Sequence, residues 1–225
     1  MMQYFHRQVQ LWGEETQQSL QDKKIAIIGA GGLGSSLAFA LGASGIGEIH
    51  MIDFDEVSLH NIHRQIAFKV GDEGKNKAVI NAQLIQERCP YVKAIAHECT
   101  FDEWTKKNIE VDLIIDGTDN LHTRGDINTY AKKIAMPWLY GSVEAYHGQV
   151  CFIEESSFND AFKIIKKTPA GITGPIVMHI ASLQANIALR YLAGLPVKKD
   201  KLYYLFFNDE GELITQKFGL PKAQE

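Results

Sequence analysis

One stretch decides the fold: Ile25-Ala26-Ile27-Ile28-Gly29-Ala30-Gly31-Gly32-Leu33-Gly34. An apolar run ends in glycines, and a helical pattern follows at once. Gly29, Gly31 and Gly34 fit the spacing G-x-G-x-x-G. When a buried parallel strand turns tightly into a helix, the first helical N–H groups stay unpaired, and missing Cβ atoms let a phosphate come close. The stretch therefore predicts a nucleotide site, against the alternative of a glycine-rich turn without a ligand.

The chain that follows alternates between strand and helix patterns as far as Ser142. Alternation of this kind predicts βαβ units, and so a Rossmann-like α/β fold with a mostly parallel sheet and helices on both faces. The expected strands are 24–28, 48–53, 92–97, 111–116 and 137–141, and the expected helices are 32–43, 74–89, 102–108 and 120–135.

The second part of the chain has a different rhythm. Residues 143–154 read as a strand with no helix before it, and 202–207 with 213–218 read as a hairpin. We therefore expect antiparallel strands in the C-terminal half. The helix 176–192 is apolar nearly all round, which places it in the core or against a second subunit, and His179 on it is expected to be a core histidine.

No linker divides the chain, so residues 1–225 are expected to form a single domain. It would comprise an N-terminal arm (1–22), a nucleotide-binding βαβ half (23–142) and a C-terminal half (143–225).

Composition excludes several classes of protein. The net charge is −4 and no Lys/Arg block occurs, which disfavours nucleic acid as a partner. No run approaches the roughly 18 apolar residues that span a bilayer, and the N-terminus has no signal-peptide core. The three cysteines, Cys89, Cys99 and Cys151, form no C-x-x-C pair. Their number and spacing favour a reducing, cytoplasmic location and disfavour disulfides or a Cys-rich zinc site.

Asp53 ends the second expected strand, where an acid hydrogen-bonds the ribose of a bound nucleotide. The alternative is a strand-ending acid that merely meets solvent. On the glycine turn and Asp53 alone, an NAD-dependent enzyme fits equally well.

Charged residues further along the chain favour a different ligand. Arg64 follows Asp53 closely and Lys77 lies in the first turn of the next helix. A triphosphate undergoing substitution needs such cations and a metal ion, whereas a pyrophosphate held by amides needs little cationic help. Asp119 follows a buried strand at the carboxyl edge of the sheet, where it is a plausible Mg²⁺ ligand. Taken singly, the cations could be solvated surface charges and Asp119-Asn120 a helix N-cap.

As a set, these motifs closely resemble the ThiF/MoeB/HesA family, the bacterial relatives of ubiquitin-activating enzymes. The match runs in order from about residue 4 to 145 and recurs more weakly in the helix 176–194. The matching segments are Phe5-His6-Arg7-Gln8, Gly29–Gly34, Asp53-Phe54-Asp55-Glu56-Val57, Asn61-Ile62-His63-Arg64-Gln65, Gly74-Lys75-Asn76-Lys77-Ala78 and Gly117-Thr118-Asp119-Asn120.

The resemblance implies a homodimeric adenylyltransferase that uses ATP and Mg²⁺. In that family the C-terminal Gly-Gly tail of a small ubiquitin-like sulfur-carrier protein attacks the α-phosphate of ATP. The implied catalytic residues are Arg7 (reaching into the partner subunit), Arg64, Lys77 and the Mg²⁺ ligand Asp119. The implied ATP-binding residues are Gly29, Gly31, Gly32, Gly34, Asp53, Asp55, His60, Asn61, Ile62, His63, Arg64, Gln65, Lys77, Asp119 and Asn120.

Two departures from the family pattern limit what the resemblance implies. Many relatives bind a structural zinc through two C-x-x-C pairs, which this sequence lacks, so no zinc is expected. Many also carry a cysteine for covalent sulfur or carrier transfer in the loop that corresponds to about 155–173, where this sequence has none. The simplest prediction is a reaction that stops at the adenylate.

The leading hypothesis is adenylation of a sulfur carrier for thiamine thiazole synthesis, with the molybdopterin-synthase carrier as the near alternative. A second alternative keeps the nucleotide site but adenylates a carboxylate on another acceptor, such as a modified tRNA base. An NAD-dependent oxidoreductase and a non-catalytic nucleotide-binding scaffold are the remaining alternatives.

Overall fold

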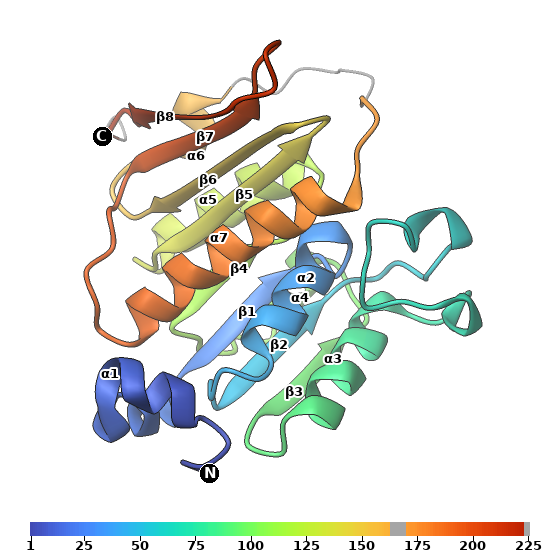
Figure 1. The fold of residues 1–225 in the computed structure, drawn as a ribbon, viewed down its shortest axis with the longest axis vertical. Coiled ribbons are helices and arrows are strands. Elements are labelled where there is room, and N and C mark those ends of the chain that lie inside the picture. The colour runs from blue at the N-terminus through green and yellow to red at the C-terminus, as the bar shows by residue number, and fades with distance from the viewer. Residues whose placement is uncertain (163–169, 223–225) are drawn as a thin grey trace.

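The computed structural model describes residues 1–162 and 170–222 and contains one eight-stranded sheet (Figure 1). The strands lie in the order β3-β2-β1-β4-β5-β6-β7-β8. The first five in this order are parallel, and β6, β7 and β8 continue the sheet antiparallel. The predicted fold class is therefore confirmed. The strands are β1 (Lys24–Ile28), β2 (Glu48–Ile52), β3 (Lys93–His97), β4 (Leu113–Asp116), β5 (Trp138–Glu144), β6 (His147–Ile153), β7 (Lys201–Phe207) and β8 (Leu213–Gly219).

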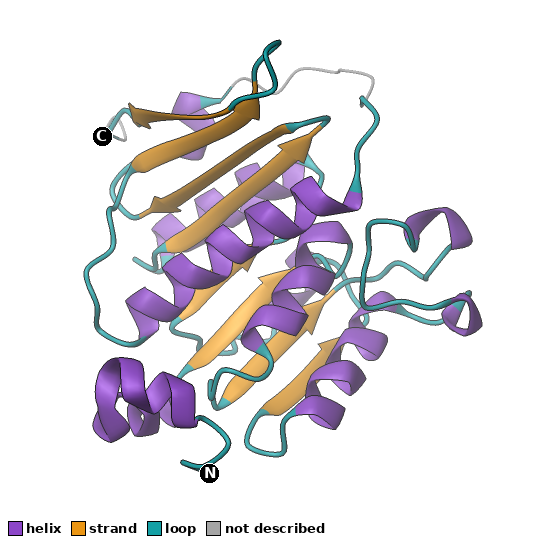
Figure 2. Ribbon diagram, in the orientation of Figure 1, coloured by secondary structure: helices purple, strands orange, loops and turns teal. Residues whose placement is uncertain are grey.

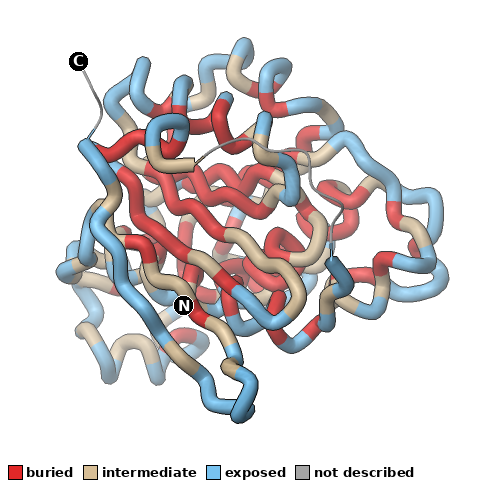
Figure 3. Tube along the Cα trace, turned by 90° about the horizontal axis from the view of Figure 1, so that it is seen from above, coloured by how far each residue is buried: buried red, intermediate tan, exposed pale blue. Residues whose placement is uncertain are grey.

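Helices cover both faces of the sheet, with α2, α3 and α7 on one face and α4, α5 and α6 on the other (Figure 2). The buried segments gather in the middle of the molecule (Figure 3). The helices are α1 (His6–Ser19), α2 (Gly32–Leu41), α3 (Lys77–Arg88), α4 (Phe101–Thr105), α5 (Leu121–Lys133), α6 (Phe158–Ala161) and α7 (Gly174–Leu192), and the 3₁₀ turns are Leu20–Asp22, Leu59–Asn61 and Val70–Asp72. No helix among these is long and apolar enough to cross a membrane.

Strand β1 shows why a layer of helices packs on each face of the sheet. Its side chains alternate, so that Ile25 and Ile27 join the core under α2 and α7, while Ala26 and Ile28 join the core under α4 and α5. A strand buried on both faces needs this continuous apolar run. The prediction of a buried parallel strand at 24–28 is confirmed with the same bounds.

Helix α7 packs on α2, β5 and β6 through Ile176, Val177 and Ile180. Its outer face is not covered: Met178 is 43% exposed, and His179 is exposed as well. The expectation that His179 is a core histidine is therefore wrong. Successive side chains of a helix point about 100° apart, so Met178 and His179 face away from the side on which Val177 and Ile180 are buried.

Two segments differ from their predicted bounds. The strand expected at 143–154 is the end of β5 and all of β6, because the chain reverses between Glu144 and His147. For the N-terminal arm the sequence predicts a short helix around 14–20, whereas α1 begins at His6, is interrupted at Gly13 (φ +85°) and buries Gln17 behind this break.

The arm lies at the amino edge of the parallel strands, far from the glycine turn at their carboxyl edge (Figure 1). Gln17 donates from Nε2 to the Ser44 carbonyl and accepts from Trp12 Nε1 at 3.1 Å, which attaches the arm to the loop before β2. A further lysine cluster that the sequence places before Pro169 (Lys163, Lys166 and Lys167) lies outside the described residues.

Candidate functional site

A cavity of about 850 Å³ opens at the carboxyl ends of β1, β2 and β4. The order of strands reverses here, since β1 has β2 on one side and β4 on the other. In open α/β sheets this reversal point is where ligands bind. The predicted site residues that line the cavity are Gly29, Gly31, Gly32, Asp53, Asp55, Arg64, Gln65, Lys77, Asp119 and Asn120.

Gly29 and Gly117 line the floor of the cavity, and the predicted site residue Gly34 does not line it but packs its backbone against theirs from behind. A Cβ atom at Gly34 would lie 2.0 Å from the carbonyl oxygen of Gly29. One at Gly117 would lie 2.8 Å from the same oxygen, and Gly29 itself adopts φ +90°. No other residue type fits at these positions without moving the backbone. The sequence motif supplied Gly29 and Gly34, and the fold adds Gly117 from the end of β4.

Helix α2 begins at this floor and points its amino end at the cavity. Gly31 is its N-cap and offers no capping side chain, and the first i→i−4 bond runs from the Ser35 N–H to the Gly31 carbonyl. The N–H groups of the first turn therefore have no partner within the helix. Unpaired amides together with the helix dipole favour a bound anion, and the binding of a phosphate at this helix end stays a prediction.

Asp53 joins the glycine turn to the segment after β2. Its Oδ2 accepts from the Ala30 N–H at 2.7 Å and its Oδ1 accepts from the Asp55 N–H at 2.8 Å. Burial raises the pKa of this carboxyl group, although both N–H donors oppose the shift. The carboxylate is thus directed at the turn and lines the cavity, and its remaining lone pairs are available to a ribose hydroxyl.

Lys77 is buried at the start of α3 and is not a solvated surface charge. Its Nζ lies 2.9 Å from Oδ2 of Asp55, whose side chain is 52% exposed. Asn76 caps the same helix end and donates from Nδ2 to the Asp53 carbonyl at 3.0 Å. These contacts fix the position of the lysine beside the cavity, where the adjacent helix dipole favours a bound anion over a free cation.

Arg64 and Gln65 reach the cavity from the loop after β2. Arg64 Nη1 donates to the His60 carbonyl at 3.0 Å and lies 2.8 Å from His63 Nε2. Gln65 is 6% exposed, lies against Gly31, and its Oε1 has no hydrogen-bond partner among the described residues.

The other predicted residues of this loop support it and do not line the cavity. Asn61 is buried and accepts from the Ser58 N–H, which closes a 3₁₀ turn. Ile62 packs in a small cluster with Val57 and Phe68. His60 and His63 are exposed. Arg7 lies on α1 at the opposite edge of the sheet, where its Nη1 donates to Gln10 Oε1 at 3.1 Å, so it does not reach this cavity within one subunit.

Asp119 lies at the cavity on the loop between β4 and α5. Its carboxylate is exposed and makes no hydrogen bond with any described residue, whereas the neighbouring Asn120 caps α5. Within residues 1–162 and 170–222, no three His, Cys, Asp or Glu side chains are grouped to hold a metal ion. A Mg²⁺ ion bound mainly by phosphate oxygens and water needs only one or two carboxylates, and Asp119 fits that role.

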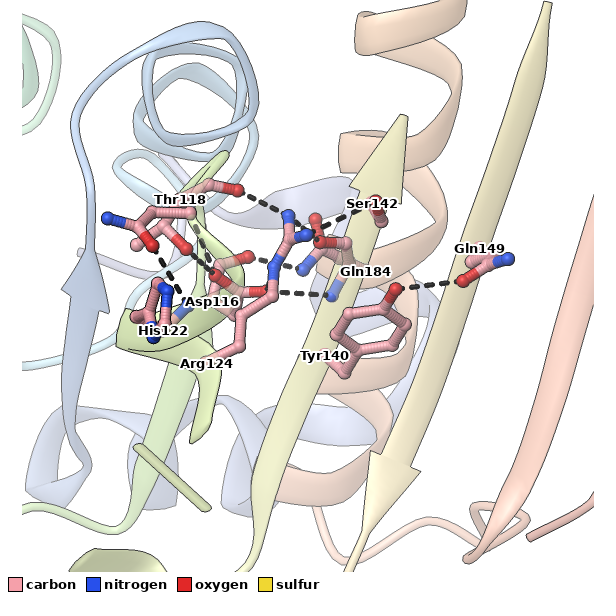
Figure 4. A network of polar contacts seen from close by, with 10 residues as sticks. Asp116, Thr118, His122, Arg124, Tyr140, Ser142, Gln149 and Gln184 are labelled. Carbon is pink, nitrogen blue, oxygen red and sulfur yellow. Dashed lines mark hydrogen bonds and ion pairs between the residues drawn. The ribbon is translucent and has the colours of Figure 1, made fainter. Parts of the chain in front are cut away.

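A buried ion pair lies beneath this loop, and the motifs did not predict it. Arg124 Nε lies 2.9 Å from Asp116 Oδ2, with side-chain exposures of 5% and 0% (Figure 4). Burial opposes the charged guanidinium, but the Asp116 carboxylate, the Tyr140 side chain and the Asp119 carboxylate together outweigh it, and the pKa of Arg124 is raised. The only sequence signal was an arginine on the inner face of the helix that follows an acid-ended strand.

Comparisons with known proteins find relatives over most of the chain. The model of the ThiF family matches residues 5–224. The adenylyltransferase and sulfurtransferase MOCS3 of Caenorhabditis briggsae is 30% identical over 91% of this chain, which spans only 54% of that protein. The sulfur carrier protein ThiS adenylyltransferase of Escherichia coli K12 is 28% identical over 83% of the chain and 78% of that protein.

Solved structures show the same fold. A crystal structure of PaaA superimposes with a TM-score of 0.83 at 22% identity, over 99% of this chain and 74% of that one. Escherichia coli MccB with ATP gives a TM-score of 0.81 at 22% identity, over 96% of this chain and 72% of that one.

Proposed function

The chain belongs to the ThiF family, and on this premise we propose that it is an ATP-dependent adenylyltransferase acting on the C-terminal glycine of a small ubiquitin-like sulfur-carrier protein. One observation carries the proposal: a single cavity joins the glycine floor to Arg64, Lys77 and Asp119. A dinucleotide held by amides needs the floor alone, whereas a triphosphate under attack needs the charges as well.

The proposed reaction is substitution at the α-phosphorus of ATP. A carboxylate oxygen of the carrier forms the new P–O bond, the bond from the α-phosphorus to the α,β-bridging oxygen breaks, and pyrophosphate leaves with the electron pair. The products are an acyl-adenylate and pyrophosphate. The attacking carboxylate is already ionised at neutral pH, so the site needs no general base.

The residues of the cavity position the reactants and stabilise charge. The amides at the start of α2 hold phosphate oxygens, and Asp53 accepts from the ribose hydroxyls. Arg64 and Lys77 stabilise the negative charge that develops on the phosphates. Asp119 would hold Mg²⁺, which when bound would supply Lewis-acid stabilisation of the leaving pyrophosphate.

The carrier of thiamine thiazole synthesis is our first choice of substrate. The likeness to a ThiS adenylyltransferase supports it. The near alternative is the molybdopterin-synthase carrier, because the motifs do not separate the two. The relatives named MOCS3 and MoeZ are also sulfurtransferases by name, but this chain spans about half of their length. Because the loop near 155–173 has no cysteine, the proposed reaction ends at the adenylate.

ATP–pyrophosphate exchange tests the proposal. Purified protein with Mg²⁺, ATP and a carrier that ends in Gly-Gly is expected to exchange labelled pyrophosphate into ATP, and a carrier lacking the last glycine is the control. Exchange measured with the carrier of thiamine thiazole synthesis and with the molybdopterin-synthase carrier, at equal concentration, identifies the pathway. Folded protein that exchanges pyrophosphate with neither of these carriers contradicts the proposal. A gel shift with tRNA would favour adenylation of a carboxylate on RNA, and binding of NAD(H) in place of Mg·ATP would favour an oxidoreductase.

We also propose a homodimer in which Arg7 completes the partner's site, since Arg7 is remote from the cavity of its own subunit. Light scattering tests the dimer. Mixing inactive Arg7→Ala and Lys77→Ala variants tests the shared site: random re-pairing of subunits restores up to roughly a quarter of the wild-type activity, because only mixed dimers contain one intact site. No recovery after demonstrated subunit exchange contradicts an Arg7 contribution from the partner.

A further inference from the structure

The ion pair of Asp116 and Arg124 is placed where it controls the loop that carries Asp119. Asp116 ends β4, and Arg124 lies in the first turns of α5, so the pair spans the base of the connecting loop. Replacing a buried ion pair by apolar side chains of similar volume is often neutral or stabilising. The pair therefore calls for an explanation other than stability.

The remaining contacts of the guanidinium go to the two segments on either side of it. Arg124 Nη2 donates to the Thr118 carbonyl and, at 3.0 Å, to the Gly141 carbonyl. Its Nη1 donates to Ser142 Oγ at 3.3 Å, and the guanidinium lies over the Tyr140 ring with 5.3 Å between its carbon and the ring centroid. The arginine thus joins the Asp119 loop to the middle of β5 (Figure 4).

Thr118 is held at each of its polar groups. Its carbonyl accepts from Arg124, while its N–H and hydroxyl donate to Asp116 Oδ1 at 2.9 and 2.7 Å. Gly117 before it is pressed against the Gly29 backbone. Gln184 of α7 donates to the Asp116 carbonyl at 2.8 Å and secures the end of β4.

Asp119 is the first residue beyond these contacts. Its carboxylate is exposed at the cavity and makes no hydrogen bond among the described residues, but it interacts electrostatically with the Arg124 guanidinium. Its position therefore depends on the preceding backbone and on Arg124. A lysine in place of Arg124 would reach at most part of this set, because an ammonium group lacks the planar fork that contacts two segments at once.

We propose that Arg124 is a positioning residue: its guanidinium holds the Thr118 carbonyl against β5 and so keeps the Asp119 carboxylate where it binds the Mg²⁺ of the nucleotide. The inference rests on the proposed function only in taking Mg·ATP as the ligand, and does not depend on the carrier.

Arg124→Lys is the test, measured by calorimetric ATP binding in EDTA and across a Mg²⁺ titration. We expect ATP affinity in EDTA to stay unchanged, while the Mg²⁺ concentration for half-maximal tightening rises roughly tenfold or more, the usual size of an outer-sphere effect. Hydrogen exchange at residues 117–121 of the nucleotide-free protein is expected to become faster. Arg190→Lys is the matched control, because Arg190 is exposed and its guanidinium donates, among the described residues, only to the Pro196 carbonyl.

The double variant Arg124→Lys/Asp119→Asn separates positioning from a general structural role. If Arg124 acts through Asp119, the double variant loses no more Mg²⁺ dependence than Asp119→Asn alone. Equal loss of affinity with and without Mg²⁺, or additive losses in the double variant, overturns the proposal.

If Arg124→Lys does not fold, Thr118→Ala removes only the hydroxyl bond to Asp116 and is expected to shift the Mg²⁺ requirement in the same direction by a smaller factor. No shift in that folded variant contradicts the proposal. Wild-type protein that binds Mg·ATP normally but exchanges pyrophosphate with no carrier contradicts the proposed function and leaves the role of Arg124 standing.

Discussion

The cavity has two walls that are built in different ways. The glycine wall, which is the floor described above (Gly29 and Gly117, with Gly34 packed behind them), is backbone packed on backbone, with no space for a single added carbon. The charged wall (Arg64, Lys77 and Asp119) consists of side chains that line the cavity, of which Lys77 is buried and Asp119 is exposed. The first gives the site its shape and is part of the fold, whereas the second gives it charge and can be changed without disturbing the core. Substitutions on the two walls should therefore appear in different measurements.

Gly34→Ala is expected to have the largest effect, on folding itself. The new Cβ would lie 2.0 Å from the Gly29 carbonyl oxygen, so β1 and α2 must separate. We expect the free energy of unfolding to fall by about 3 kcal/mol or more, at or above the upper range for overpacking. Urea denaturation measures the effect. Gly71→Ala is the control, since a Cβ there meets nothing within 4 Å. Equal denaturation midpoints for the two variants would show that the backbone around Gly34 can accommodate a Cβ atom.

Lys77→Met is expected to show the opposite behaviour. Methionine keeps the buried stem but removes the charge, so pyrophosphate exchange should fall about 100-fold, the usual effect of removing one charge-stabilising donor. Stability should change little, because Asp55, which loses its partner, is half-exposed. The control is Lys75→Met, two residues away, whose exposed Nζ bonds Asp72 outside the cavity. Equal loss of exchange in both variants would exclude a specific role for Lys77.

Gly31→Ala tests where the boundary between the walls lies. A Cβ at Gly31 would be 3.3 Å from Nε2 of Gln65, which is a side chain and can shift. We expect a stability loss below about 1 kcal/mol. The methyl group would instead occupy space near the phosphates and raise KM for ATP by roughly tenfold, as a loss of about 1.4 kcal/mol of binding. Should Gly31→Ala unfold as readily as Gly34→Ala, the residue belongs with the rigid wall.

The local segments of the site could be predicted from the sequence, whereas the contacts between distant segments could not. Local pattern was sufficient for β1, the turn and α2, because an apolar run, three spaced glycines and a helix lie within one segment. It was also sufficient for the acid at Asp53. The contact of Gly117 with Gly29 joins residues far apart in the chain, and nothing in the local pattern of either residue indicates it.

Long-range geometry also decided which charged residues act directly. The family resemblance implied that all six residues from 60 to 65 bind ATP. In the structure a 3₁₀ turn directs Arg64 and Gln65 to the cavity and places Asn61 under the loop. Arg124 had no motif and proved to be the most extensively bonded cation beside the cavity. The roles of these residues stay predictions until the variants are measured.

Asp53 belongs to both walls, since it accepts from Ala30 in the glycine turn and from Asp55 beside Lys77. Burial raises the pKa of its carboxyl group above the ordinary value of 3.8. The Asp53 carboxyl group therefore stays protonated in the folded state at pH values where it is already ionised in the unfolded chain. The resulting stabilisation is complete below the ordinary pKa and is lost as the pH rises through the raised value.

Asp53→Asn removes this titration and is expected to give the smallest effect. The stability of the wild type minus that of the variant should decrease as the pH rises from below the ordinary pKa of 3.8 towards neutrality, by less than the effects of the substitutions above. Urea unfolding at several pH values measures it, with Asp22→Asn at an exposed carboxylate as the control. A difference that instead grows with pH would mean that the two N–H donors outweigh burial. The charged form of Asp53 would then help to hold the glycine wall against the charged wall.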